Sequence, residues 1–329
     1  MQETFKAFRI HAAKAFECAG IESLTINDLS PGEVLVKVEY SSVNYKDALA
    51  GTGRGKILRK SPLNGGIDLA GVVVSSDSDQ FKVGQSVLAN GSGLSEVHDG
   101  GYSEYARLPA DWLVPMPKGL NAKSAMMIGT AGFTAAQALQ RMQDNHLTPE
   151  HGPILVTGAT GGVGSFAVQL LSQSGYEVVA MTRKKDQHDY LYALGANSIV
   201  DNSEICVDDV AMHQGRWGGA IDNLGGYTLA WLTKTVKPWG VIASIGMAGG
   251  INVDTTTMPF ILRGIVLLGV SSANCPQVLR KKIWNKLGAE WLPGHLNDVF
   301  AGEFSLEQLP EAFDNLLDSK VCGRQIVCL

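Results

Sequence analysis

The sequence predicts an α/β protein in which a doubly wound parallel sheet is joined to a second domain rich in β-strands. Three observations support this fold class. Up to about residue 120, short strand-like runs are separated by Gly, Pro, Asn and Asp. From about Ala122, apolar runs of strand length alternate with helical patterns. The length of 329 residues exceeds one typical domain and fits two.

The N-terminal stretch consists of short runs that we expect to form strands. Closely spaced runs bounded by turn residues are typical of an irregular all-β domain or barrel. The clearest of them read "GEVLVKVEYSSV", "GIDLAGVVVSS", "GQSVLANGS" and "YSEYARLPADWLVPMP". Beyond about Phe300 the pattern returns to a helix and a final strand, which we expect to rejoin this domain. We therefore predict one domain from residues 1–122 and 300–329, and another from residues 123–299.

The middle of the chain contains six apolar runs of strand length, with helical or loop segments between them. They read "PILVTGA", "YEVVAMT", "NSIVD", "GGAIDNLG", "WGVIASIGMA" and "GIVLLGV". The first is followed by a helical pattern at Val163, Ala167, Leu170 and Leu171, with Gly175 as the expected stop. Apolar strands that alternate with helices indicate a doubly wound parallel sheet of the Rossmann type.

Composition and charge exclude several classes of function. A net charge of −5 and a pI of about 5.8 argue against a general binder of nucleic acids or anionic membranes. The N-terminus lacks a signal-peptide pattern, and no stretch approaches the roughly 18 apolar residues of a membrane span. The five cysteines are scattered, as is typical of a reducing compartment. We therefore expect a cytoplasmic, soluble protein.

The stretch "ILVTGATGGVG" predicts a dinucleotide-binding turn, because an apolar strand precedes it and a helix follows it. Gly161 would let a pyrophosphate approach the backbone, and Gly164 would let the helix pack closely on the strand. Ala159 replaces the first glycine of G-x-G-x-x-G, and its small side chain relaxes the pattern without forbidding the turn. The alternative is an ordinary strand-to-helix turn that uses glycine only for packing.

The choice of nucleotide depends on the residues about 20 positions after the turn, where an NAD site places an acid for the ribose 2′-hydroxyl. The sequence there reads Thr182, Arg183, Lys184, and the first acid is Asp186. Basic side chains attract a 2′-phosphate, whereas an acid repels it. This pattern predicts NADPH over NADH. The alternative is a solvated basic turn at the end of a strand.

Several motifs in order resemble the medium-chain dehydrogenase/reductase superfamily, and more narrowly its zinc-free acrylyl-CoA reductase group, whose members are often labelled quinone oxidoreductases. They read "SSVNYKDALAGTGRGKI", "GIDLAGVV", "MIGTAGFTA", "VTGATGGVG", "AGGINVDTTTMPFILRG" and "GRQIVCL". The resemblance covers essentially the whole chain. It implies a GroES-like catalytic domain beside the Rossmann domain, with NADPH held in the cleft between them to reduce an activated C=C bond.

The resemblance also implies positions for the cofactor. They are Tyr45 beside the cofactor, Thr160, Gly161, Gly162 and Val163 at the pyrophosphate, Thr182, Arg183 and Lys184 at the 2′-phosphate, and Met247 and Ser272 beside the nicotinamide. The chain departs from its relatives after "LGA", where Asn197 and Ser198 replace a basic residue that relatives often carry. This departure weakens the expected preference for NADPH without removing it.

A catalytic zinc ion is not expected. The zinc alcohol dehydrogenases of the same superfamily need Cys, a His-Glu pair and another Cys, and the matching positions here are Asn44, Ile67-Asp68 and Ala131. Both thiolates and the imidazole are missing, and zinc needs three or four such ligands. No G-x-S-x-G elbow or Ser-His-Asp order supports acyl transfer either.

Single residues leave alternatives open. Asn44 and Asp47 either fix the turn of "NYKD" or contact the substrate, and the structural role is the expected one. Tyr45 is the better functional candidate, because its ring suits a cofactor-lined cleft and its hydroxyl can donate a hydrogen bond. We take Tyr45 and Asn44 as the candidate catalytic residues. Arg324 binds a cofactor or substrate phosphate, or else forms a structural ion pair.

The leading hypothesis is an enoyl-thioester reductase that converts acryloyl-CoA to propanoyl-CoA with NADPH. The basic loop "GRGKILRK" would attract the phosphates of coenzyme A, unless its charges are only solvated. A second reading is reduction of a quinone or an alkenal, and a third is a non-catalytic NADPH-binding sensor. The apolar run "GIVLLGVSS" would lie at a sheet edge and pair with its own copy in a homodimer.

Overall fold

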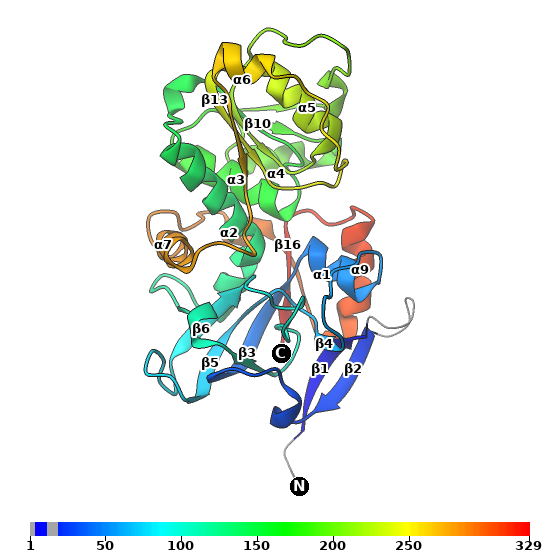
Figure 1. Cartoon of the computed structure of the whole chain (residues 1–329), viewed down its shortest axis with the longest axis vertical. Coiled ribbons are helices and arrows are strands. Elements are labelled where there is room, and N and C mark those ends of the chain that lie inside the picture. Colours follow the sequence, from blue (N-terminus) through cyan, green and yellow to red (C-terminus); the bar gives the residue numbers. More distant parts are fainter. Residues whose placement is uncertain (1–3, 12–18) are drawn as a thin grey trace. The chain divides into compact units, whose positions relative to one another are not determined.

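The computed structural model describes residues 4–11 and 19–329, and these form two compact units. The first unit contains Met1–Thr130, Ser272–Leu292 and Phe300–Leu329, and the second contains Ala131–Ser271 and Pro293–Val299 (Figure 1). The predicted bounds of independently folding domains stay a prediction. The described part of the chain contains no helix long and apolar enough to cross a membrane.

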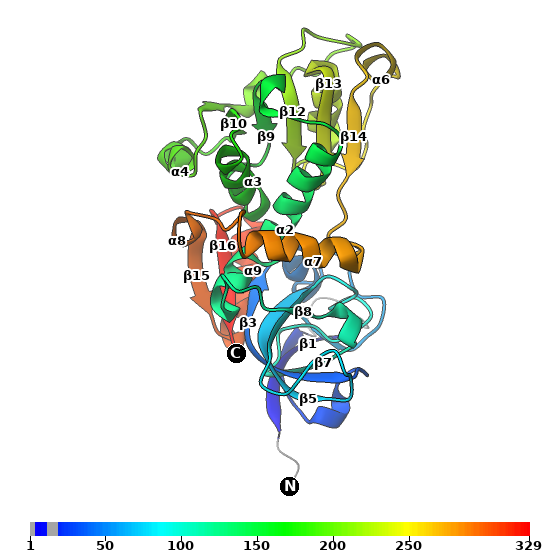
Figure 2. The ribbon, with the colours of Figure 1, turned by 90° about the vertical axis from the view of Figure 1, so that its left-hand side faces the viewer.

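The second unit is built on a six-stranded parallel sheet. Its strands are β9 (Ile154–Val156), β10 (Val178–Met181), β11 (Ser198–Val200), β12 (Trp217–Asp222), β13 (Val236–Ser244) and β14 (Val266–Gly269). Their order is β11-β10-β9-β12-β13-β14, and Figure 2 shows most of them side by side. This order is that of a Rossmann sheet, so the predicted doubly wound fold and all six predicted strands are confirmed.

Four α-helices of the second unit follow its strands, as a doubly wound sheet requires. They are α3 (Gly162–Gln173), α4 (His188–Ala193), α5 (Gly226–Thr235) and α6 (Met258–Arg263). Two further helical segments belong to this unit without following a strand of the sheet, namely α8 (Leu296–Val299) and residues 131–144 of a long helix. Helix α3 packs on β9 and β10, and α5 packs on β12 and β13. Helix α3 ends at Gln173, two residues before Gly175, whose φ of +82° only glycine adopts readily. The predicted start and stop of this helix are therefore correct.

The first unit contains a seven-stranded sheet and a three-stranded sheet. The larger sheet has β15 (Phe300–Phe304), β16 (Arg324–Cys328), β3 (Val34–Val43), β5 (Asp68–Ser76), β6 (Ser86–Asn90) and β8 (Val114–Pro115) in this order, with β7 (Tyr105–Leu108) also paired to β3. The smaller sheet has β2 (Ala19–Leu24), β1 (Phe5–Ile10) and β4 (Leu63–Asn64). Strand β16 pairs antiparallel with β3, so the C-terminal strand rejoins the N-terminal part, as predicted.

Helices in the first unit pack together although they come from segments far apart in the sequence. Helix α1 (Tyr45–Gly51) lies beside α9 (Leu309–Leu317), where Phe313 joins a buried cluster with Phe8 and Tyr102 (Figure 1). Helix α7 (Gln277–Leu287) also belongs to this unit. Helix α2 (Ala122–Asp144) begins in the first unit and is interrupted at Gly129, whose φ is +50°. The break in the helix at Gly129 contributes to the candidate site in the first unit.

Candidate cofactor and active site

The glycine turn of the second unit has the geometry of a dinucleotide cradle. It follows β9 through Gly158, whose φ is +57°, and α3 begins at Gly162 with Gly161 as its N-cap. A Cβ on Gly164 would lie 2.3 Å from the carbonyl oxygen of Gly158, so the close approach of helix and turn requires glycine there. Ala159 is buried and lies outside the left-handed region, which explains why an alanine replaces the first glycine of the pattern.

The turn presents backbone donors that fit a pyrophosphate. The N–H of Gly161 bonds within the turn, 3.1 Å from the oxygen of Gly158, and the N–H of Ser165 closes the first helical turn on Gly161 at 2.8 Å. The N–H groups of Gly162 and Val163 have no acceptor within the helix, as at any helix N-terminus. Gly161 is exposed, and a Cβ added to it would touch only the Gly158 oxygen, at 3.4 Å. The described residues of the turn therefore fit the pyrophosphate of a dinucleotide.

A buried polar cluster joins the ends of β9 and β12, where the strand order reverses. Thr157 donates its hydroxyl to Asp222 at 2.7 Å, and the Gly225 N–H donates to the same carboxyl group at 2.8 Å. Asn223 closes the cluster by donating its side-chain N–H to the Thr157 carbonyl at 2.8 Å. Burial raises the pKa of Asp222, and the hydrogen bonds from Thr157 and Gly225 oppose the rise. In open α/β sheets, ligands bind at such a reversal point, so the cluster lies where a dinucleotide is expected.

The predicted 2′-phosphate residues follow β10, the strand beside β9. Thr182 is buried and its hydroxyl accepts from the Lys184 N–H at 3.1 Å, while the Arg183 side chain is exposed. Asp201 follows the neighbouring β11; hydrogen bonds from Ser203 lower its pKa, and the charges of Lys185 and Arg183 lower it further. Asn197 accepts from the Val178 N–H at 2.7 Å. Asn197, where relatives often carry a basic residue, thus anchors the start of β10 by a hydrogen bond.

In the first unit a buried polar network surrounds Asp68. Its carboxylate accepts from the Ser42 hydroxyl at 2.6 and 2.7 Å, from the Thr130 N–H at 2.8 Å and from the Asn44 amide at 3.2 Å. The Tyr102 hydroxyl donates to the Ser42 carbonyl at 3.0 Å. By the family resemblance, Asn44 and Asp68 are expected at two of the positions that hold zinc ligands in zinc dehydrogenases. Here the two side chains hydrogen-bond to each other.

Arg324, at the start of β16, lies in the same network. Its guanidinium donates to the Ser42 hydroxyl at 2.7 Å, to the Asn44 side-chain oxygen at 3.2 Å, and to the carbonyls of Val43 and Met127 at 3.1 and 3.3 Å. The side chain is 3% exposed. Burial lowers the pKa of Arg324, and the nearby carboxylates counteract this effect. This geometry supports the structural alternative for Arg324, and its predicted role in cofactor binding stays a prediction.

Gly129 leaves the space that the Arg324 guanidinium occupies. A Cβ at this position would lie 2.6 Å from both the Arg324 Nη2 and the Ser42 hydroxyl, and 3.0 Å from the Asp68 carboxylate. The interruption of α2 at this residue also turns the Thr130 N–H toward Asp68. The break in the helix therefore forms part of the network.

Asp47 holds the start of α1 in place and so positions Tyr45. It accepts from the Ile67 N–H at 2.9 Å, from the Asn44 N–H at 3.1 Å and from the Asn44 amide at 3.0 Å. Burial, and then the charge of Asp68, raise the pKa of Asp47 to about 7. Tyr45 itself is 50% exposed. The turn thus buries Asn44 and Asp47 as its support and presents Tyr45 at the surface of this unit.

The two predicted nicotinamide residues lie in loops. Met247 follows β13 and is 69% exposed. Ser272 belongs to a loop held by the buried Arg280, whose guanidinium donates to the Ser272 and Ala273 carbonyls at 3.1 and 3.2 Å and also to that of Asn90. Arg280 was not singled out in the sequence, because an arginine on an amphipathic helix gives no local sign of burial.

Two family models match most of the two units. The model described as "Alcohol dehydrogenase GroES-like domain" matches residues 30–118, and the one described as "Zinc-binding dehydrogenase" matches residues 162–287. The chain is 42% identical to acrylyl-CoA reductase AcuI of Ruegeria pomeroyi over 94% of both chains. It belongs to the medium-chain dehydrogenase/reductase family, in the AcuI group. The sequence-based recognition of this family is confirmed.

Two other similar proteins carry a different activity in their name or a bound cofactor in their structure. YhfP of Bacillus subtilis, named as a candidate quinone oxidoreductase, is 44% identical over 94% of both chains. Its solved structure with bound NAD matches with a TM-score of 0.95 at 42% identity, over all of both chains. The structure of Escherichia coli YhdH with bound NADPH matches with a TM-score of 0.94 at 41% identity, over 98% of this chain and 99% of the other.

Proposed function

We propose that the chain reduces the C=C bond of a short 2-enoyl-CoA with NADPH, and that acryloyl-CoA, giving propanoyl-CoA, is its substrate. The observation that carries this proposal is the 42% identity to acrylyl-CoA reductase over 94% of both chains. The glycine turn supplies the backbone donors that a pyrophosphate needs. The basic residues after β10 supply the charge that distinguishes NADPH from NADH.

The chain's own residues would bind and orient the reactants. When bound, NADPH would be the hydride donor for the β-carbon of the enoyl thioester, and we propose water as the source of the proton at the α-carbon. Negative charge develops on the thioester oxygen and needs a donor placed there in advance. The Tyr45 hydroxyl is our candidate, since Asp47 and Asn44 fix the first turn of α1 and leave Tyr45 exposed. Gly162 and Val163 would bind the pyrophosphate.

The loop "GRGKILRK" in the first unit supports a coenzyme A thioester as the substrate. Arg54, Lys56, Arg59 and Lys60 are all exposed. The N–H groups of Arg59 and Lys60 both bond to the carbonyl of Glu96, at 2.7 and 3.2 Å, so the backbone of this loop is held. Four exposed cations on a held loop, in a protein of net charge −5, are suited to bind the phosphates of coenzyme A.

The substrate proposal is tested by steady-state oxidation of NADPH with acryloyl-CoA, crotonyl-CoA, a small quinone and an alkenal. We expect the highest kcat/KM with acryloyl-CoA. The double variant Arg59→Ala/Lys60→Ala should raise KM for the CoA thioester about 10–100-fold, since charge-assisted contacts contribute roughly 1.5–3 kcal/mol. The same variant should leave KM for the quinone unchanged. A higher kcat/KM with the quinone than with any CoA thioester would overturn the proposal.

The second candidate is a quinone or alkenal reductase, and the name of YhfP favours it. It uses the same cofactor and the same glycine turn with a less charged acceptor. The third is a non-catalytic NADPH-binding sensor, which the same assay distinguishes by tight binding of NADPH without turnover. We also propose a cytoplasmic location, which is supported by the five cysteines being scattered along the sequence without a dense framework.

We further propose a homodimer formed through β14. This strand ends the six-stranded sheet, and large apolar side chains near it are exposed, including Trp239, Ile261 and Leu262 at 73%, 75% and 63%. An exposed edge strand favours pairing with its own copy. We expect sedimentation velocity at micromolar concentration to give the mass of a dimer, and Leu267→Lys, on β14 itself, to shift it toward the monomer. Sedimentation of the wild type as a monomer would contradict the proposal.

A further inference from the structure

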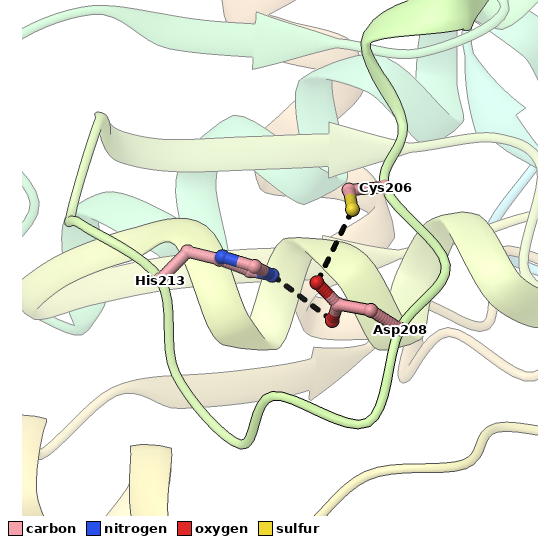
Figure 3. A group of neighbouring side chains, drawn as sticks. All are labelled: Cys206, Asp208 and His213. Carbon is pink, nitrogen blue, oxygen red and sulfur yellow. Dashed lines mark hydrogen bonds and ion pairs between the residues drawn. The ribbon is translucent and has the colours of Figure 1, made fainter.

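A loop after β11 brings three metal-ligating side chains together on the second unit, and neither the glycine turn nor the proposed reaction uses them. Cys206, Asp208 and His213 each offer one ligand atom, and these atoms lie within 4.8 Å of one another (Figure 3). The Cys206 thiol lies 3.2 Å from one carboxylate oxygen of Asp208, and the His213 Nε2 lies 3.2 Å from the other. The side chains of Asp208 and His213 are about one-third exposed, and Cys206 is exposed.

These separations are close to those of a zinc centre. Zinc bonds to sulfur, nitrogen and oxygen at tetrahedral angles place neighbouring ligand atoms roughly 3.3–3.7 Å apart. The two separations of 3.2 Å involve different oxygens of Asp208, and all three ligand atoms lie within 4.8 Å of one another, so the side chains would rotate to bring the thiol, the imidazole and one carboxylate oxygen around the ion. Such a rotation needs no change in the backbone.

The backbone of the loop is held on both sides of the cluster. The Lys234 ammonium donates to the Asp208 carbonyl at 2.6 Å, and the His213 N–H donates to the Lys234 carbonyl at 3.0 Å. The Arg263 guanidinium donates to the carbonyl of His213, and the Val210 N–H donates to the Asp208 carboxylate at 3.2 Å. Because helices α5 and α6 anchor the loop in this way, the three ligands converge before any ion binds.

We propose that Cys206, Asp208 and His213 form a binding site for a divalent zinc-type ion, with water as the fourth ligand. A thiolate with an imidazole is a ligand pair that favours zinc over magnesium or calcium. Thiolate and carboxylate together carry two negative charges. The Lys234 ammonium, 3.6 Å from the Asp208 carboxylate, offsets one of them. The site therefore binds the ion more weakly than a four-ligand structural site, and it stabilises the loop rather than taking part in hydride transfer.

The test uses cobalt(II) and zinc on the full-length protein after treatment with a chelator. Cobalt should produce a thiolate-to-metal charge-transfer absorption, and titration with zinc should abolish it. Calorimetry should give one zinc site per chain. Cys206→Ser should remove the charge-transfer band, and His213→Gln should weaken zinc binding about tenfold or more, since loss of an outer partner alone costs about 10–100-fold. Zinc should raise the Tm of the wild type but not that of Cys206→Ser.

Matched controls are available in the same chain. His295 and Asp298 form another His-Asp pair, 2.9 Å apart, and no cysteine is near them in the sequence. Cys328 is another exposed cysteine. His295→Gln and Cys328→Ser should leave the cobalt band and zinc affinity unchanged. The metal-free Tm of Cys206→Ser should equal that of the wild type, which shows that the variant folds. Absence of the cobalt band in the wild type, or its persistence in Cys206→Ser, would overturn the proposal.

Discussion

Arg324→Met is expected to lower the free energy of unfolding by about 3–5 kcal/mol, because it removes the cation from a buried network and leaves a carboxylate without compensation. Arg324 reaches Asp68 through the Ser42 hydroxyl, which accepts from Nη2 at 2.7 Å and donates to the carboxylate at 2.6 Å. Methionine fills much of the volume but donates no hydrogen bond. The carbonyls of Val43 and Met127 also lose their donor.

Urea denaturation of the wild type and the variant measures this loss. Arg54→Met is the matched control, since Arg54 pairs with Asp314 at 3.6 Å but both side chains are more than half exposed. Exposed pairs contribute about 0–1 kcal/mol, so this control should unfold almost like the wild type. Arg324→Lys keeps the charge and should lose less than Arg324→Met. Equal losses for Arg324→Met and Arg54→Met would contradict a buried role for Arg324.

The second unit was predictable because its signals are local. Each strand run is apolar and bounded by turn residues, so the six strands follow from short windows of sequence. Gly161 marks the start of α3 and Gly175 its end, and both glycines lie within two residues of the helix. Repeated strand–helix units then leave few possible sheet orders, and the Rossmann order is the common one.

The polar network of the first unit was not predictable from the same reasoning. Arg324 lies 282 positions after Ser42 in the sequence, and only the pairing of β16 with β3 brings them together. Gly129 reads as one small residue in a helical stretch, whereas it is the point where α2 breaks to admit the guanidinium. "NYKD" did indicate a turn held by Asn44 and Asp47. The partner of that turn could not be read from the sequence.

The cluster at the ends of β9 and β12 was missed for a related reason. Asp222 closes a buried strand, and a polar residue at a strand end reads as the start of a loop. Its position at the reversal of strand order follows only when β12 is known to lie beside β9. The pairing with Thr157, 65 positions earlier, then identifies the two residues as one buried unit.

The double variant Arg183→Ala/Lys184→Ala is expected to raise KM for NADPH about 10–100-fold and to change KM for NADH little. NADPH differs from NADH only by its 2′-phosphate, and charge-assisted contacts to such a group contribute about 1.5–3 kcal/mol. The exposed Arg183 and the turn fixed by Thr182 and Lys184 follow directly after β10. Steady-state kinetics with each cofactor, at one ionic strength, measures the two constants.

Lys185→Ala provides the control for this prediction. Lys185 is exposed in the same turn, so its replacement removes a neighbouring charge without touching either proposed contact. If the turn attracts the 2′-phosphate only through its total positive charge, Lys185→Ala should raise KM for NADPH as much as Arg183→Ala or Lys184→Ala does alone. If Arg183 and Lys184 bind the 2′-phosphate directly, the control should stay near the wild type. Equal increases for NADPH and NADH in the double variant would show instead that these side chains bind a part common to both cofactors.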